Sequence, residues 1–139
     1  MNTDKDIEIK TPKSEVHPEY PEQDLTGKIL ECAFTVHNTL GAGFLERVYS
    51  NALTVELLAA NLNSIQQARL EVKYRDAIVG EYFADVIVED RVLLELKACA
   101  SLDPSHSAQI MNYLRASGIR VGLLMNFGRP KLEYRRLVC

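Results

Sequence analysis

Three charged residues lie inside stretches of sequence that are otherwise apolar. Asp85 is flanked by Tyr-Phe-Ala and Val-Ile-Val, while Glu95 and Lys97 alternate with leucines in Val-Leu-Leu-Glu-Leu-Lys-Ala. Continuous apolar runs of this kind are typical of strands that are covered on both faces. A carboxylate inside such a strand costs free energy unless a cation or hydrogen-bond donors hold it. An Asp with a Glu-x-Lys pattern also occurs on exposed edge strands, but the apolar surroundings favour a site with a chemical task.

The spacing predicts that these side chains share one face of a sheet. Glu95 and Lys97 are two residues apart and therefore project from the same side of a strand. If a three-residue loop joins Val88 to Val92, Asp85 lies directly opposite Glu95, with the two Cβ atoms about 4.5–5.5 Å apart. A two-residue turn would instead place Glu95 on the other face, so the geometry of this hairpin decides between a site and no site.

Two bare carboxylates at that separation repel each other, and a hard divalent cation bound between them removes the conflict. Carboxylate oxygens are ligands that suit Mg²⁺ or Mn²⁺. Lys97, one step further along the strand, is then positioned to hold a nucleophilic water or to stabilise negative charge on a phosphate oxygen. We therefore predict that Asp85 and Glu95 bind the metal and that Lys97 takes part in catalysis beside them.

The elements around these residues predict an α/β fold with one mixed sheet flanked by helices. Three strands joined by tight turns form an antiparallel meander, and the strand after a long helix can return to the sheet in parallel. Thr26 or Asp24 is the expected N-cap of the first helix, and Asp103-Pro104 and Gly118 mark the ends of the third. The expected elements are helices at 26–40, 45–59 and 104–117, and strands at 69–74, 78–88, 92–98, 120–125 and 133–138.

Composition excludes several classes of protein. The chain has 139 residues, of which 47% are hydrophobic and 25% charged. These values are ordinary for a soluble globular domain, and no apolar run approaches the ~20 residues of a membrane span. The three cysteines are far apart and lack CxxC spacing, which argues against a disulfide framework or a zinc cluster and favours a reducing, cytoplasmic setting. Collagen, coiled coils, membrane proteins and small secreted proteins are thereby excluded.

Charge divides the chain into two parts. Residues 1–23 hold six acids against three lysines, and three of the five prolines, a composition that cannot bury enough apolar surface to offset its ordering entropy. We expect a disordered or loosely docked tail there and a single domain over 24–139. Within that domain the segment 115–136 is basic and suits a nucleic-acid partner, although a solvated face is the simpler interpretation. The nucleic-acid contacts predicted there are Arg115, Arg129, Lys131, Arg135 and Arg136.

The segment Gly43-Phe-Leu-Glu46-Arg-Val-Tyr49 resembles the signature of the small prokaryotic GxxExxY proteins. Later segments resemble the same family in order and spacing, so that the resemblance covers about residues 24–139. These segments are Ala84-Asp85, Glu95-Leu-Lys97, Ala108-Gln109-Ile-Met-Asn-Tyr113-Leu and Gly122-Leu-Leu-Met-Asn126-Phe127-Gly128. The family is grouped with the PD-(D/E)XK nuclease superfamily, whose core of a helix, a three-strand meander, a helix and a strand agrees with the elements expected above.

This resemblance implies roles for individual residues. In the superfamily the Asp and the Glu of the ExK motif bind the metal, the Lys assists the attacking water, and a Glu from the first helical region often adds a ligand. Those roles fall on Asp85, Glu95, Lys97 and Glu46. Ala84 stands where the superfamily nominally has Pro, which is a frequent variation.

The helix after the third strand is expected to contribute as well. Many nuclease branches carry Gln-x-x-x-Tyr there, which corresponds to Gln109 and Tyr113. The two residues share a helix face with His106, and an ordinary helix–sheet contact is the alternative interpretation of the pair. With the resemblance taken into account, we predict that Gln109 orients a water or phosphate at the catalytic site and that Tyr113, His106 and Tyr49 support it.

Together these features predict a Mg²⁺- or Mn²⁺-dependent phosphodiesterase of nuclease type that acts on nucleic acid, either DNA or RNA. Two alternatives stay open. One is a catalytically idle nuclease fold used as a binding or assembly module, which the neutral charge of residues 24–139 favours. The other is a metal-dependent hydrolase of a small phosphate ester. A small nuclease fold that cuts both strands of a duplex is expected to act as a homodimer, and no membrane partner is expected.

Overall fold

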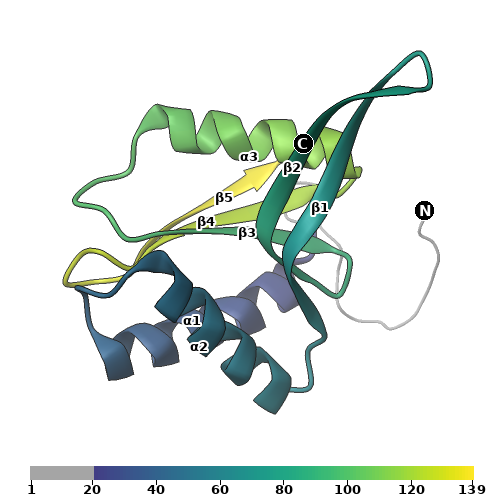
Figure 1. Cartoon of the computed structure of the whole chain (residues 1–139). Helices are drawn as coiled ribbons and strands as arrows, with labels where there is room; N and C mark the ends of the chain where they lie inside the picture. Colours follow the sequence, from purple (N-terminus) through teal and green to yellow (C-terminus); the bar gives the residue numbers. More distant parts are fainter. Residues whose placement is uncertain (1–20) are drawn as a thin grey trace.

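A five-stranded mixed sheet forms the centre of the protein (Figure 1). The computed structural model describes residues 21–139. The strands lie in the order β1-β2-β3-β4-β5, and every neighbouring pair is antiparallel except the parallel pair β3 and β4. In chain order the elements are α1 (Gln23–Leu40), α2 (Glu46–Ala59), β1 (Ser64–Tyr74), β2 (Ala77–Val88), β3 (Val92–Lys97), α3 (Pro104–Ser117), β4 (Val121–Asn126) and β5 (Glu133–Val138).

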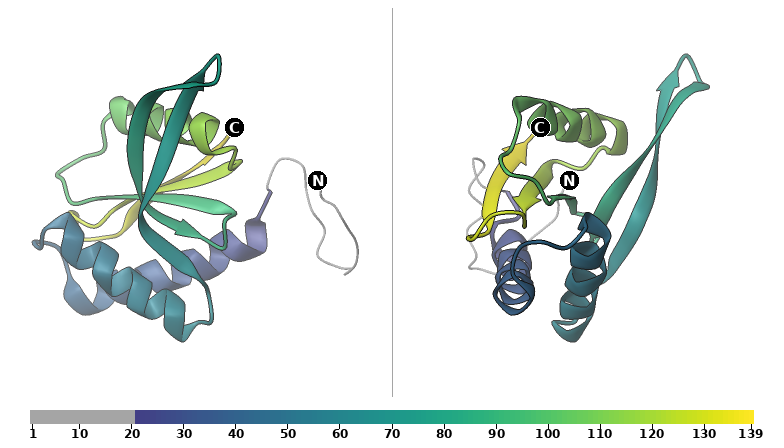
Figure 2. Two further views of the ribbon diagram at one scale, coloured as in Figure 1. Left: turned by 45° about the vertical axis from the view of Figure 1, so that its right-hand side comes forward. Right: turned by 60° about the vertical axis from the view of Figure 1, so that its left-hand side comes forward.

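Helices cover both faces of the sheet. α1 and α2 lie against one face and α3 lies against the other, as Figures 1 and 2 show. In β3, Leu94 belongs to the hydrophobic cluster under α1 and α2, whereas Leu93 belongs to the cluster under α3. Because successive side chains of a strand point to opposite faces, Glu95 and Lys97 share the α3 face with Leu93.

The architecture predicted from the sequence is confirmed. β1, β2 and β3 form an antiparallel meander, and α3 carries the chain back so that β4 pairs with β3 in parallel. α3 begins where Asp103-Pro104 predicts, because the Asp103 side chain accepts a hydrogen bond from the backbone N–H of Ser105 at 2.9 Å. The helix ends at Gly118, whose φ of 77° is the left-handed conformation that glycine adopts without strain.

The start of α1 differs from the prediction. The helix begins at Gln23, and Glu22 occupies the N-cap position without a side-chain hydrogen bond. Neither Thr26 nor Asp24 is therefore the cap. Thr26 lies inside the first turns, where its hydroxyl donates to the carbonyl of Gln23 at 3.1 Å. The cap expectation was wrong because the helix extends further toward the N-terminus than its apolar period.

Residues 21–23, which composition assigns to the tail, contact the folded domain. Pro21 is buried, and its carbonyl accepts a hydrogen bond from Arg136 of β5. Glu22 forms an ion pair with Arg91 at 3.0 Å, beside the loop between β2 and β3. Residues 1–20, the rest of the predicted tail, lie outside the described residues.

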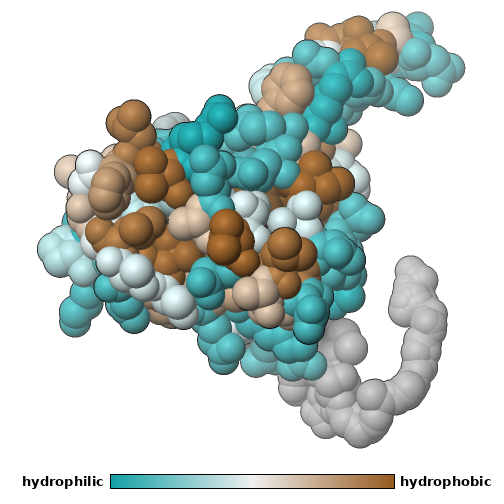
Figure 3. Space-filling model, turned by 60° about the horizontal axis from the view of Figure 1, so that its bottom comes forward, coloured by the Kyte–Doolittle hydropathy of each residue, from teal (hydrophilic) through white to brown (hydrophobic). Residues whose placement is uncertain are grey.

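The outward side of α2 and the loop before it carry apolar side chains. Leu45, Val55 and Leu58 are exposed, and the space-filling view of the underside formed by α1 and α2 shows hydrophobic groups gathered there (Figure 3). This surface is distinct from a membrane span: over residues 21–139, no helix is both long and apolar enough to cross a bilayer.

Candidate active site

The hairpin between β2 and β3 has the register that a three-residue loop predicts. Val88 pairs with Val92, and the ladder continues through Ile87 opposite Leu93. The loop closes with a hydrogen bond from the backbone N–H of Arg91 to the carbonyl of Val88 at 2.9 Å. This prediction is confirmed, and it fixes which residues of the two strands meet beyond the last ladder pair.

Where the backbone ladder between β2 and β3 ends, hydrogen bonds from the backbone to side chains connect the two strands. The last ladder pair is Val86 with Leu94, and the next residues in this register are Asp85 and Glu95. The Asp85 carboxylate accepts a hydrogen bond from the backbone N–H of Leu96 at 2.8 Å, and the Glu95 carboxylate approaches the backbone N–H of Asp85 at 3.4 Å. Each carboxylate thus lies against the other strand, and the two acidic side chains meet.

The environment of this pair opposes two negative charges. Glu95 is 3% exposed, and its pKa is raised to about 9, first by burial, then by the charge of Asp85 and a hydrogen bond with that side chain. The charge of Lys97 acts in the opposite direction but does not compensate. Within residues 21–139, no cationic side chain forms an ion pair with either carboxylate. The metal-free pair is therefore electrostatically unfavourable.

The residues present fit a hard divalent cation. Two carboxylates supply oxygen ligands only, and Mg²⁺ is commonly held by one or two carboxylates while water and substrate phosphate oxygens complete its shell. Over the described part of the chain, no three His, Cys, Asp or Glu side chains form a group that could hold a metal ion. A site here would consequently rest on Asp85 and Glu95, with Glu46 outside their immediate group.

Glu46 and Tyr49 belong to a neighbouring structural unit. Glu46 is exposed in the first turn of α2. Tyr49 is fully buried, its hydroxyl donates to the carbonyl of Gly41 at 2.5 Å, and its ring stacks on Phe127 at 4.7 Å. Tyr49 also accepts a hydrogen bond from the backbone N–H of Phe44 at 3.2 Å. The structure thus explains Tyr49 as the anchor of the loop between α1 and α2.

α3 brings Gln109 and Tyr113 close to the carboxylate pair. The amide of Gln109 donates a hydrogen bond to the hydroxyl of Tyr113 at 3.0 Å. The pKa of Tyr113 is raised by burial and next by the charge of Glu95, with a smaller contribution from Asp85. The Tyr113 hydroxyl therefore lies within electrostatic reach of both carboxylates. His106, by contrast, caps the start of α3, where its Nδ1 accepts from the backbone N–H of Asp103 at 3.1 Å.

At the level of Asp85, the side chains of β1 and β2 change the face of the sheet to which they point. Strict strand alternation does not predict this change. Gln67, opposite Asp85, has a φ of 53°, in the left-handed region that non-glycine residues rarely adopt, while the register on either side is unbroken. Val86 packs under α1 and α2, whereas Ala84, two residues earlier, packs under α3. This change of face interrupts the alternation of apolar residues, so the sequence pattern predicted only residues 69–74. The strand β1 in fact begins at Ser64.

Tyr82 is the residue near the site that the sequence analysis missed. Its ring centroid lies 5.4 Å from that of Tyr113. Tyr82 precedes Asp85 by three residues, and strict alternation would place the two on opposite faces. The change of face described above brings Tyr82 to the α3 side. An aromatic residue so close to Asp85 in the sequence was the only available signal.

The structure separates the five basic residues predicted to contact nucleic acid. Arg129 and Arg136 donate hydrogen bonds to backbone carbonyl groups. Lys131 and Arg135 are exposed before and within β5. Arg115 lies on α3, on the side of the sheet that carries Glu95. The five residues thus come from α3, the loop before β5 and β5 itself, and their contact with nucleic acid stays a prediction.

Comparison with known proteins supports the same fold. The solved structure of SSO0001 superposes with a TM-score of 0.52 at 16% sequence identity, over 84% of this chain and 58% of that one. This chain thus spans little more than half the length of SSO0001, and the likeness concerns the fold. No functionally curated protein matches the sequence.

The family model of the PD-(D/E)XK nuclease superfamily matches residues 23–137. The match is to the superfamily, so that assignment to the GxxExxY proteins stays a prediction from the motif at 43–49. Over this length, nearly the whole described chain, the match establishes that the protein belongs to the PD-(D/E)XK nuclease superfamily.

Proposed function

We propose that this member of the PD-(D/E)XK nuclease superfamily is a divalent-metal-dependent phosphodiesterase that acts on nucleic acid. The observation that carries the proposal is the pair formed by half-buried Asp85 and buried Glu95 at the end of the β2–β3 ladder. Lys97 follows on the same face of β3. Superfamily membership supports nuclease chemistry in general, and these three residues supply the corresponding functional groups.

Asp85 and Glu95 would hold Mg²⁺ or Mn²⁺, with Glu46 as a further ligand through water. When bound, such an ion polarises a phosphate oxygen and lowers the pKa of a coordinated water. Asp85 is suited to this task because its hydrogen bond from the backbone N–H of Leu96 fixes the carboxylate before any ion arrives. That preorganisation reduces the entropy lost on binding.

Lys97 and Gln109 would act on the reacting groups. The Lys97 ammonium can hold the attacking water by hydrogen bonding and stabilise the charge that develops on a non-bridging phosphate oxygen. Gln109 is restrained by Tyr113, and its amide can orient a water or a phosphate. In this assignment Tyr113 is a positioning residue, because it acts through Gln109.

A binding or assembly module without catalysis is the second candidate. It is favoured by one observation: among residues 21–139, no third acidic, histidine or cysteine side chain joins the Asp85–Glu95 pair. Calorimetric titration with Mg²⁺ and Mn²⁺ separates the two candidates, because an idle module has no need to bind the ion.

The direct test is cleavage of labelled single- and double-stranded DNA and RNA in Mg²⁺ or Mn²⁺ by the wild type and by Lys97→Ala. We expect metal-dependent cleavage that Lys97→Ala reduces by at least about a hundredfold. Lys28→Ala, which removes an exposed lysine of α1 on the other side of the sheet from the pair, is the matched control and should cleave like the wild type. Absence of metal-dependent cleavage of every substrate, or equal rates for Lys97→Ala and the wild type, would overturn the proposal.

A further inference from the structure

A cleft of about 910 Å³ lies between the β1–β2 ribbon and α3. Figures 1 and 2 show the β1–β2 ribbon crossing α3 and extending beyond it, and both elements contribute residues to the lining of the cleft. The cleft is lined from β1 by residues 69–73, from β2 by Tyr82 and Ile87, and from the second half of α3 by Asn112 and Arg115 among others.

The cleft reaches the candidate active site through two aromatic rings. Tyr82 lines the cleft and packs against Tyr113. Tyr113 in turn lies on α3, which packs on the face of the sheet that carries Glu95. A polymer held at the carboxylate pair can therefore continue along α3 past Tyr82 into the cleft.

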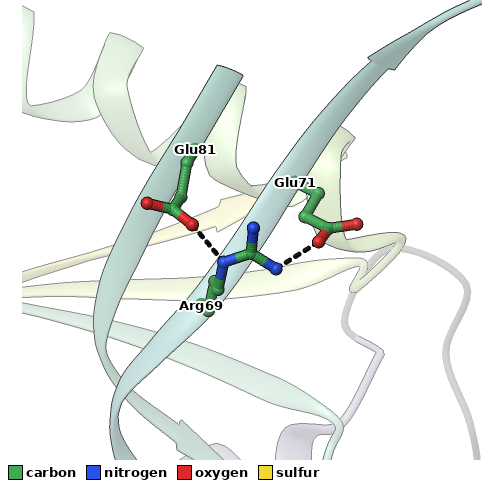
Figure 4. A network of polar contacts seen from close by, with 3 residues as sticks. All are labelled: Arg69, Glu71 and Glu81. Carbon is green, nitrogen blue, oxygen red and sulfur yellow. Dashed lines mark hydrogen bonds and ion pairs between the residues drawn. The ribbon is translucent and has the colours of Figure 1, made fainter. Parts of the chain in front are cut away.

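The charges in the cleft are few. Arg69 is engaged by Glu71 and Glu81 in an exposed network (Figure 4). The remaining cations of the lining are Lys73 on the ribbon and Arg115 on the helix, whose guanidinium donates a hydrogen bond to Asn112, and Asp90 offsets part of their charge. Duplex DNA presents a dense row of phosphates, and its non-specific binding depends on neutralising many of them. This lining is poorly suited to that task.

Apart from Asn112 and Ser117, the rest of the lining is apolar or aromatic. Tyr82 is about half exposed, so that its ring is available to a ligand. Leu70, Val72, Ala116 and Ile119 complete the apolar wall. Unpaired bases stack on aromatic rings and contact apolar side chains, while a small number of cations holds the intervening phosphates. In a duplex those base faces are already stacked and are not accessible.

We propose that this cleft binds unpaired nucleotides of a nucleic-acid strand next to the phosphate held at Asp85 and Glu95. A base stacks on Tyr82, and the phosphates that follow pass between Lys73 and Arg115. This inference rests on the proposed function, because the phosphate held at Asp85 and Glu95 determines from which end the nucleic-acid strand enters the cleft. It narrows the substrate class to single strands, or to duplexes with an unpaired segment.

The test is binding of fluorescently labelled oligothymidylate, oligouridylate and a DNA duplex, measured by anisotropy in EDTA over a range of salt. EDTA prevents cleavage, so the result does not depend on catalysis. We expect the single strands to bind at least about tenfold more tightly than the duplex. The DNA and RNA strands then show which sugar the cleft accepts.

Four variants locate that binding. Tyr82→Ala should weaken single-strand binding by about fivefold or more, whereas Tyr82→Phe, which keeps the ring, should retain it. Arg115→Ala should weaken binding and lower the slope of log affinity against log salt by about 0.7, the share of one phosphate contact. Lys28→Ala, which removes an exposed lysine of α1 outside the cleft, should change neither value. Melting temperatures of all variants establish that they are folded.

The outcomes separate this inference from the proposed function. Equal or tighter duplex binding, or equal losses for Arg115→Ala and Lys28→Ala in folded proteins, would overturn the cleft proposal even if the wild type cleaves nucleic acid. Cleft-dependent binding of single strands by a protein that cleaves nothing in Mg²⁺ or Mn²⁺ would support the cleft while refuting the nuclease.

Discussion

The backbone N–H of Leu96 donates a 2.8 Å hydrogen bond to the carboxylate of Asp85. The side chain of Asp85 in β2 thereby binds the backbone of β3 beyond the last pair of the backbone ladder. Asp85 consequently has two functions that can be separated by mutation: it is a hydrogen-bond acceptor for β3, and its charge helps to keep the neighbouring Glu95 protonated.

Asp85→Asn should abolish the response to metal, and above about pH 9, where Glu95 is ionised, it should also stabilise the metal-free protein. The Asn side-chain oxygen can still accept from Leu96, while the repulsion with ionised Glu95 disappears. Wild type should gain stability from Mn²⁺ by mass action, about 2.7 kcal/mol at a hundredfold excess over the dissociation constant. Thermal melts of both proteins with and without Mn²⁺ measure the two effects. If Asp85→Asn lowers the melting temperature and Mn²⁺ does not change that of the wild type, the two carboxylates have a structural role only.

Asp85→Ala provides the matched comparison. It removes the charge as Asp85→Asn does, but it also leaves the N–H of Leu96 without its acceptor. Loss of a partner for a buried donor costs about 1–3 kcal/mol. We expect Asp85→Ala to melt below Asp85→Asn, and equal melting temperatures would argue against the hydrogen bond as a stabilising contact.

Lys97→Ala should separate catalysis from metal binding. The lysine is not an expected ligand, so the Mn²⁺-induced rise in melting temperature should persist while cleavage is lost. The measurement pairs thermal melts with single-turnover cleavage. If the variant loses the metal response as well, Lys97 acts on the ion site rather than on the water or phosphate.

Stability of the metal-free protein should fall as pH rises. The carboxyl of Glu95 has a pKa of about 9 in the folded protein against an ordinary value of 4.5. Between these values the folded state retains a proton that the unfolded chain has lost, so that deprotonation favours unfolding. Melting temperatures between pH 5 and 9 in EDTA should therefore decline, and Glu95→Gln should flatten the decline.

Metal binding should show the opposite dependence on pH. The ion competes with the proton on Glu95, so Mg²⁺ affinity should rise toward pH 9 and binding should release a proton. Calorimetric titrations in two buffers of different ionisation enthalpy measure that proton. Binding that is independent of pH over this range would contradict the assignment of Glu95 as a ligand.

Deletion of residues 1–20 should leave the melting temperature nearly unchanged, as the acidic, proline-containing composition indicates. Deletion through Gln23 should lower it by several degrees, which corresponds to about 1 kcal/mol for a domain of this size. The difference arises because the longer deletion removes the buried Pro21 and the ion pair of Glu22 with Arg91. Equal melting temperatures for the two truncated proteins would show that these contacts contribute nothing.

Gly128→Ala should destabilise the fold near the end of β4. A Cβ at this position would lie 2.5 Å from the backbone nitrogen of Cys99, so that the backbone must move. Gly27→Ala is the control, because a Cβ there meets nothing within 4 Å and alanine is favoured in a helix by about 0.5–1 kcal/mol. We expect opposite shifts in melting temperature for the two variants.

The sequence was sufficient for the topology and for the meeting of Asp85 with Glu95. The loop between Val88 and Val92 is short enough for its length to determine the register, and register determines which side chains share a face. Local signals also located α3. The Asp103 side chain caps the start of the helix, and the left-handed backbone of Gly118 ends it.

What could not be predicted depends on contacts between distant segments. The left-handed backbone of Gln67 has no signature in its own sequence, because only the turning of the whole β1–β2 ribbon toward α3 requires it. The role of Tyr82 follows from that turn and was missed with it. The sequence also could not show that the basic residues of 115–136 are divided among α3, a loop and β5, because closeness in sequence does not determine which element carries each residue.

The β1–β2 ribbon also offers a place to lengthen the chain without disturbing the chemistry. Its tip, at Arg75 and Asp76, lies beyond the point at which both strands leave the central sheet, and the two residues have the positive φ values of a tight hairpin turn. Extra strand pairs inserted there would add length outward and leave Asp85 in register with Glu95. The ribbon is thus a natural graft point, where a peptide tag or a recognition loop can be carried while the carboxylate pair keeps its geometry.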